Sequence, residues 1–127
     1  MKKETENRLK IANNDLKVAE ELFKGGLYLN VIEHSHAALE KLIKGIIVEQ
    51  NISPPRIHSL LKLVSTALIE NVDNDIKTTL KELDRLYISV KYPDDIDYIQ
   101  SQLPKTEVDV IFKKVKGIYK MLEKNLK

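Results

Sequence analysis

Apolar residues recur with the period of an α-helix along almost the whole chain, and no stretch alternates with period two for long enough to form a sheet. The first run ends at Gly25-Gly26 and steps by three and four residues through Leu9, Ala12, Leu16, Ala19 and Phe23. Residues three and four apart lie on one helix face, so this spacing predicts a helix over residues 4–24. The same period elsewhere restricts the chain to an all-α fold.

The second run covers residues 27–50 and is apolar over a much wider arc of the helix surface. Its apolar members are Val31, Ile32, Leu39, Leu42, Ile43, Ile46 and Ile47. A helix that packs on one side needs only a narrow stripe, so a wide arc indicates contact on two sides. We therefore expect this helix to lie centrally among its neighbours or to give its second face to another subunit.

Three further helical segments follow Pro54-Pro55, where two prolines without amide donors interrupt the pattern. We expect a short helix near residues 60–68 that starts at His58 or Ser59, and a long one over 74–92 that ends before Pro93. After an acidic loop, a last helix follows Pro104, with Thr106 as its N-cap. The expected architecture is one domain over residues 1–127: an up-and-down antiparallel four-helix bundle with one additional short helix.

Composition agrees with one folded domain, since 43% of the 127 residues are hydrophobic and 31% are charged. Apolar runs are far shorter than the roughly 20 residues that a membrane-spanning helix needs. The N-terminus continues from Met1-Lys2-Lys3 into charged residues, so we expect no secretory signal, no membrane contact and a cytoplasmic protein. Cysteine is absent, which excludes disulfides, thiolate nucleophiles and cysteine-ligated zinc.

Positive charge gathers at the C-terminal end, although the formal net charge is only +2. Six lysines lie at positions 113, 114, 116, 120, 124 and 127, against the single acid Glu123. They either solvate a surface and offset the dipole of a helix C-terminus, or form a phosphate-binding stripe.

Motifs for metal, cofactor or self-contained catalytic chemistry are missing. His34 and His36 are two residues apart and point to different faces of a helix, and no HExxH pair occurs. Asp94, Asp95 and Asp97 crowd one loop but lack the pattern and central glycine of a calcium-binding loop. No glycine-rich phosphate loop is present. We expect no metal, no cofactor and no catalytic residue, and the balance is against an enzyme.

The most distinctive polar stretch is the end of the fourth helix and the turn after it. Six residues there are candidate contacts for a nucleotide or RNA: Arg85, Tyr87, Ser89, Lys91, Tyr92 and Asp94. By their spacing, Arg85, Ser89 and Tyr92 share one helix face, while Tyr87 and Lys91 form an adjacent pair. Arginine and lysine suit phosphate contact and tyrosine suits base stacking, as in single-strand binding sites. The alternative is that the tyrosine rings pack in the core and only their hydroxyls reach water.

A second candidate pair lies on the second helix, where His36 and Glu40 are four residues apart. On one helix face, the carboxylate could orient the imidazole by a hydrogen bond. The alternative is a partly buried histidine that is satisfied within the bundle.

Several short motifs, in order along nearly the whole chain, resemble the HEPN family, small helical domains associated with nucleotide binding and RNA cleavage. They are Asp15-Leu16-Lys17-Val18-Ala19, Gly26-x-Tyr28, His36-Ala37-Ala38-Leu39-Glu40-Lys41-Leu42-Ile43-Lys44, Pro54-Pro55 with His58-Ser59-Leu60, and Tyr87-Ile88-x-x-Lys91-Tyr92-Pro93-Asp94. The last resembles the signature of a subgroup that contains Tyr-Pro-Asp. The resemblance implies this fold and ligand class, with four supporting site residues: His36, Glu40, Lys41 and His58.

Two departures from the family bear on activity. Ribonuclease members carry an arginine followed about four to six residues later by a histidine, which can serve as general acid or base. No histidine follows Arg85, and His58 lies only two residues after Arg56. Lys91 stands where the Tyr-Pro-Asp signature often has arginine, which keeps the charge but loses the planar fork.

Three hypotheses result. The resemblance implies a non-catalytic nucleotide- or RNA-binding protein, a homodimer that partners a nucleotidyltransferase in a two-protein, toxin–antitoxin-like module. The second hypothesis is an atypical ribonuclease that uses Arg85, Tyr92 and Asp94. The third is a purely structural dimeric bundle.

Overall fold

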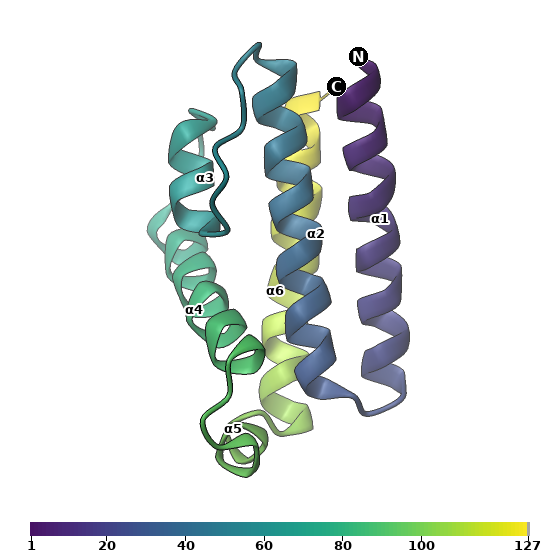
Figure 1. The fold of residues 1–127 in the computed structure, drawn as a ribbon, viewed down its shortest axis with the longest axis vertical. Coiled ribbons are helices and arrows are strands. Elements are labelled where there is room, and N and C mark those ends of the chain that lie inside the picture. Colours follow the sequence, from purple (N-terminus) through teal and green to yellow (C-terminus); the bar gives the residue numbers. More distant parts are fainter. Residues whose placement is uncertain (127) are drawn as a thin grey trace.

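The computed structural model describes residues 1–126, which are almost entirely helical (Figure 1). The helices are α1 (Lys3–Lys24), α2 (Tyr28–Glu49), α3 (Leu60–Thr66), α4 (Asn74–Lys91), α5 (Ile96–Gln102) and α6 (Lys105–Glu123), followed by a short 3-10 helix, η1 (Lys124–Leu126). Lys127, the last of the six C-terminal lysines, lies outside the described residues. Within residues 1–126, no helix combines the length and the apolar character that crossing a membrane requires.

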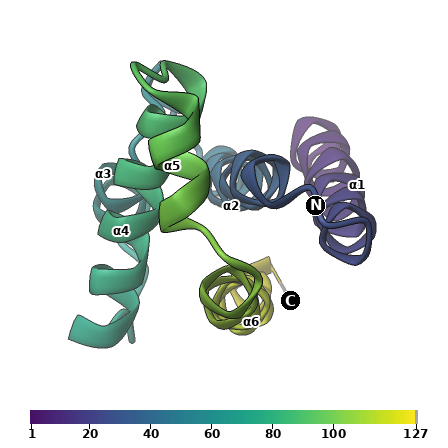
Figure 2. The same ribbon diagram turned by 90° about the horizontal axis from the view of Figure 1, so that it is seen from below.

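The four long helices run alternately up and down, which confirms the predicted all-α antiparallel bundle (Figure 1). Figure 2 shows α2 between α1 and α4, with α6 on a third side, and α2 also contacts α3. Its apolar residues, among them Ile32, Leu39 and Ile43, are fully buried within the single chain. The wide apolar arc is therefore covered by neighbouring helices, and it gives no support for a second subunit.

The segment after Pro93 is not the acidic loop that we expected, because it begins helix α5. Asp95 is the N-cap of α5, and its carboxylate accepts a hydrogen bond from the Tyr98 amide at 3.1 Å. No residue of α5 is buried, and the helix is only seven residues long, so the apolar pair Ile96 and Ile99 is too short a pattern to predict it. The described chain therefore has six α-helices, two of them short, in place of the five segments expected.

The start of α6 also differs from the expectation. Pro104 occupies the N-cap position without a side-chain hydrogen bond, and Thr106 lies inside the first turn, so Thr106 as cap was wrong. The fixed φ of proline already provides the extended geometry that precedes a helix. By contrast, Ser59 does cap α3, since its hydroxyl accepts a hydrogen bond from the Lys62 amide at 3.3 Å.

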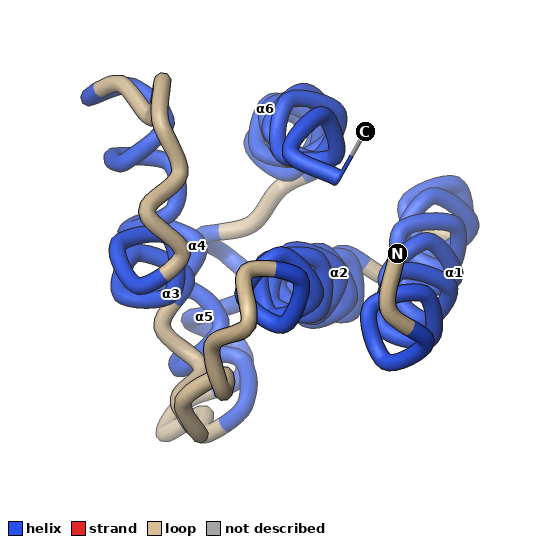
Figure 3. The backbone as a smooth tube through the Cα atoms, turned by 90° about the horizontal axis from the view of Figure 1, so that it is seen from above, coloured by secondary structure: helices blue, strands red, loops and turns tan. Residues whose placement is uncertain are grey.

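Two connections shape the two ends of α2. The turn from α1 into α2 passes through Gly26, whose φ of +76° lies in the left-handed region that favours glycine. At the other end, residues 51–59 return beside α2 to the start of α3 (Figure 1, Figure 3). This return places His58, the second-last residue of the loop, next to α2.

Candidate functional site

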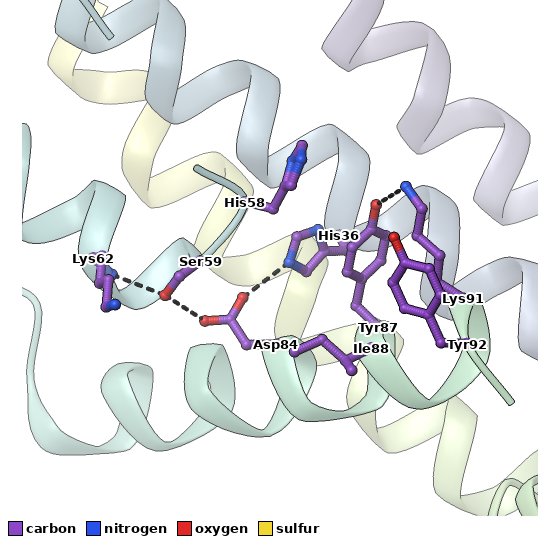
Figure 4. A pocket seen from close by; sticks show the side chains of 9 residues that line it. All are labelled: His36, His58, Ser59, Lys62, Asp84, Tyr87, Ile88, Lys91 and Tyr92. Atoms are coloured by element: carbon purple, nitrogen blue, oxygen red, sulfur yellow. Dashed lines mark hydrogen bonds and ion pairs between the residues drawn. The ribbon is translucent and has the colours of Figure 1, made fainter. Parts of the chain in front are cut away.

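A cavity of about 330 Å³ opens between α2, α3 and α4 (Figure 4). The residues that line it are His36, His58, Ser59, Lys62, Asp84, Tyr87, Ile88, Lys91 and Tyr92. They include several residues that the sequence predicts for a site: His36, His58, Tyr87, Lys91 and Tyr92. The fold thus brings together candidates from α2, from the loop before α3, and from the end of α4.

Asp84 of α4 connects the three helices that surround the cavity. Its Oδ1 accepts hydrogen bonds from His36 Nε2 and the Leu60 amide, both at 2.9 Å. Its Oδ2 accepts from the Ser59 hydroxyl at 3.1 Å and from the Leu61 amide at 3.4 Å. Burial raises the pKa of Asp84, but these hydrogen bonds outweigh it, so the pKa lies below its ordinary value. A charged carboxylate from α4 therefore caps the N-terminus of α3.

His36 is a buried imidazole, 1% exposed, whose tautomer is set by Asp84. An ionised carboxylate can only accept, so the proton of neutral His36 lies on Nε2. The ring stacks on Tyr87, with centroids 3.9 Å apart and planes 10° from parallel. Nδ1 has no hydrogen-bond partner and lies 3.8 Å from Glu40 Oε1, which is too far for a hydrogen bond. Of the two interpretations of His36, the geometry therefore favours the buried histidine held within the bundle, with Asp84 and not Glu40 as the carboxylate that orients it.

Glu40 orients a different histidine. His58 Nδ1 lies 3.1 and 3.2 Å from the two carboxylate oxygens of Glu40, and Oε2 also accepts from Lys44 Nζ at 3.1 Å. The carboxylate places the proton of neutral His58 on Nδ1 and leaves Nε2 as an acceptor. Because the His58 side chain is 65% exposed, this acceptor belongs to a group that a ligand can reach.

Two lysines line the cavity without a carboxylate partner among residues 1–126. Lys91 Nζ donates to the Tyr87 hydroxyl at 3.0 Å and lies 5.3 Å from the centre of the Tyr87 ring. This hydrogen bond is the main reason that the pKa of Lys91 is raised, so the ammonium stays charged at neutral pH. Lys62 is exposed, and its ammonium makes no hydrogen bond or ion pair with residues 1–126. Tyr92, 70% exposed, adds a second tyrosine at the rim.

The predicted strip at the end of α4 divides into two parts. Arg85 is held by Glu82 through hydrogen bonds of 2.5 and 3.0 Å, which raise the pKa of Arg85, and it lines a separate hollow toward α5 and α6. Ser89 lies one turn further and donates to the Arg85 carbonyl at 3.1 Å. Tyr92 leaves the helical conformation, with φ −127° and ψ 65°, and therefore joins Lys91 at the cavity instead of the Arg85 face.

Two more candidates lie away from the cavity. Lys41 pairs with Asp15 of α1 at 2.5 Å, on the opposite side of α2 from the cavity. Asp94 is exposed and does not line the cavity. Among residues 1–126, no cluster of three or more histidine or carboxylate side chains could hold a metal ion.

Asp84 and Lys62 were not predicted as site residues from the sequence, and Ser59 was predicted only as the start of a helix. One signal for Asp84 was available: it follows Leu80 by four residues, so it lies on the apolar face of the fourth helix. A carboxylate there needs a buried partner. Nothing in the sequence distinguishes Lys62, because exposed lysines are common on short helices.

The fold and the cavity define a small helical-bundle domain with a tyrosine-lined cavity between three of its helices. The family model described as the HEPN domain matches residues 5–125, and the chain belongs to this family. The crystal structure of TT1696 from Thermus thermophilus is similar, with a TM-score of 0.81 and 24% identity over 95% of this chain and 97% of that chain. ST0689, an archaeal HEPN homologue, matches over 100% of both chains with a TM-score of 0.77 and 25% identity. No curated protein is significantly similar.

Proposed function

We propose that this HEPN domain binds a nucleotide or RNA in the cavity between α2, α3 and α4, without catalysing a reaction. One observation carries the proposal: two tyrosines and two lysines line the same cavity, and neither lysine has a carboxylate partner among residues 1–126. Tyrosine rings offer stacking surfaces to bases, and ammonium groups that no carboxylate neutralises attract phosphates. A volume of about 330 Å³ is at the lower end for small-molecule sites, which suits part of a nucleotide.

Asp84, which lines the cavity, and Glu40, which lies behind His58, support binding without catalysis. Asp84 receives four hydrogen bonds, and Glu40 is held by Lys44 and His58. These bonds leave neither carboxylate available as a base, and Lys44 offsets the charge of Glu40. Asp84 keeps its negative charge, so Lys62 and Lys91 must outweigh it for a phosphate to bind. His36 is buried beneath Tyr87, so it supports the cavity wall instead of meeting a ligand.

His58 favours the competing function, an atypical ribonuclease. Its exposed imidazole is oriented by Glu40, as a general base requires. The residues first considered for such an enzyme are dispersed, since Tyr92 lines the cavity while Arg85 and Asp94 do not. Incubation with labelled structured RNA separates the two functions: cleavage that disappears in His58→Ala would replace the binding proposal with the enzyme.

The proposal extends to partners. The stretch from Tyr87 to Asp94 resembles the Tyr-Pro-Asp subgroup, and on that resemblance we assign the domain to a two-protein, toxin–antitoxin-like module with a nucleotidyltransferase. Ile88, 60% exposed at the rim of the cavity, supports a protein contact there, including a homodimer. Light scattering tests the homodimer, and a monomer mass at micromolar concentration would exclude it.

The binding proposal is tested with ATP, GTP and fluorescent single-stranded RNA as probes. Lys91→Ala and Tyr92→Ala should each lower the affinity roughly tenfold, because each removes a charge-assisted or stacking contact. Arg85→Ala and Tyr98→Ala are matched controls, since both side chains are exposed outside the cavity. Circular dichroism should show that every variant remains helical.

The outcomes separate the alternatives. If Arg85→Ala weakens binding and Lys91→Ala does not, the ligand lies on the Arg85 face and the cavity assignment is wrong. If no probe binds or shifts the melting temperature, the structural bundle replaces the binding protein.

A further inference from the structure

The two cavity lysines that have no carboxylate partner among residues 1–126 lie at its opposite ends. Lys62 is in the first turn of α3, beside Ser59 and the Asp84 carboxylate. Lys91 follows Asp84 by seven residues, which places it about 10 Å further along α4. Figure 4 shows Lys62 at one side of the cavity and Lys91 at the other, with His36 and Tyr87 between them.

This arrangement does not suit a free nucleoside triphosphate. The phosphates of such a ligand follow one another at one end of the nucleoside, so a matching site gathers its cations at one point, as a phosphate loop does. A nucleotide inside a strand is different, because a phosphate lies on each side of its nucleoside. Two separated cations with an aromatic surface between them match that order of groups.

Resting on the proposed function, we infer that the cavity binds one internal nucleotide of a single-stranded nucleic acid, whose two flanking phosphates meet Lys62 and Lys91. The base or sugar lies against Tyr87, which the His36 ring supports from behind. The strand leaves the cavity past Tyr92, whose exposed ring offers the next nucleotide a second stacking surface.

Opposing charges near the two lysines set the expected strength. At the Lys91 end, the C-terminus of α4 carries partial negative charge, and Glu33 is close enough to contribute to the raised pKa of Lys91. At the Lys62 end, the Asp84 carboxylate is covered by four donors. Binding is therefore weak and strongly dependent on salt.

Salt dependence measures how many phosphates the site contacts. For single strands, the slope of log affinity against log salt is about −0.7 for each phosphate neutralised, so two contacts give roughly −1.4. Fluorescence anisotropy with r(A)4, r(U)4 and d(A)4 gives this slope, and ATP competition gives the mononucleotide affinity. We expect r(A)4 to bind at least about tenfold more tightly than ATP, because it reaches both lysines.

Three variants identify the contacts. Lys62→Gln and Lys91→Gln should each make the slope less steep by about 0.7. Lys113→Gln on α6 is the matched control, because Lys113 pairs with Asp109 at 3.0 Å and belongs to the C-terminal lysine run. Its slope should equal that of the parent, and a changed slope would place the strand on the lysine run instead.

The results distinguish a wrong strand path from the absence of any nucleotide binding. If ATP binds as tightly as r(A)4, or if only Lys91→Gln changes the slope, the cavity is a mononucleotide site and the strand path is wrong. If neither ATP, GTP nor any oligonucleotide binds, the proposed function fails together with it. Equal binding of r(A)4 and d(A)4 supports the strand path, since neither lysine contacts the 2′-hydroxyl.

Discussion

Replacement of Asp84, the carboxylate that lines the cavity, by alanine should destabilise the protein. The exchange leaves the Nε2–H of buried His36 without an acceptor, which costs about 1–3 kcal/mol. It also removes the carboxylate that caps the Leu60 and Leu61 amides, worth about 1 kcal/mol. The expected loss of unfolding free energy is therefore roughly 2–4 kcal/mol.

Asp84→Asn separates the charge from the hydrogen bonds. The amide oxygen can still accept from His36 and Leu60, and the amide nitrogen can donate to the Ser59 hydroxyl, so the expected cost is only about 1 kcal/mol. Urea unfolding followed by circular dichroism measures both variants, with Asp94→Asn as an exposed control that should match the parent. An Asp84→Ala protein as stable as that control would refute the role of Asp84 in joining the helices.

The same carboxylate predicts a direction for pH dependence. The pKa of Asp84 is lower in the folded protein than its ordinary value of 3.8, so the ionised form stabilises the fold. This contribution is complete above about pH 5 and is lost as the pH falls through the folded pKa. The stability difference between parent and Asp84→Asn should therefore shrink in acid, and a difference that grows there would contradict the sign.

Three further exchanges test the bundle by thermal unfolding. Tyr119→Phe should cost about 1 kcal/mol, because the buried Tyr119 hydroxyl donates to Asn13 and so joins α6 to α1; an unchanged melting temperature would speak against that bond. Gly117→Ala should stabilise by about 1 kcal/mol, since an added Cβ meets no atom within 4 Å inside helix α6. Gly26→Ala should instead destabilise by about 1–2 kcal/mol at its positive φ, and opposite signs for the two glycines are the decisive result.

The sequence by itself determined the four long helices and their antiparallel order. The first helix was predicted over residues 4–24 and spans Lys3–Lys24 in the structure. The second was predicted over residues 27–50 and spans Tyr28–Glu49. These boundaries follow from local physics, because apolar period, glycine turns and prolines act over a few residues. Helix α5 was missed because it spans only seven residues, too few for the step from Ile96 to Ile99 to stand out as a helical period.

Only the tertiary structure decided what the apolar arc of α2 contacts and which polar groups meet. Spacing along one helix suggested His36 with Glu40, but the bundle pairs His36 with Asp84, 48 residues away, and Glu40 with His58. It also placed Tyr92 beside Lys91 and apart from Arg85, because the helix ends at Lys91. Partners between helices depend on how each helix is rotated toward its neighbours, and that rotation is set by packing of the whole core, which no local pattern contains.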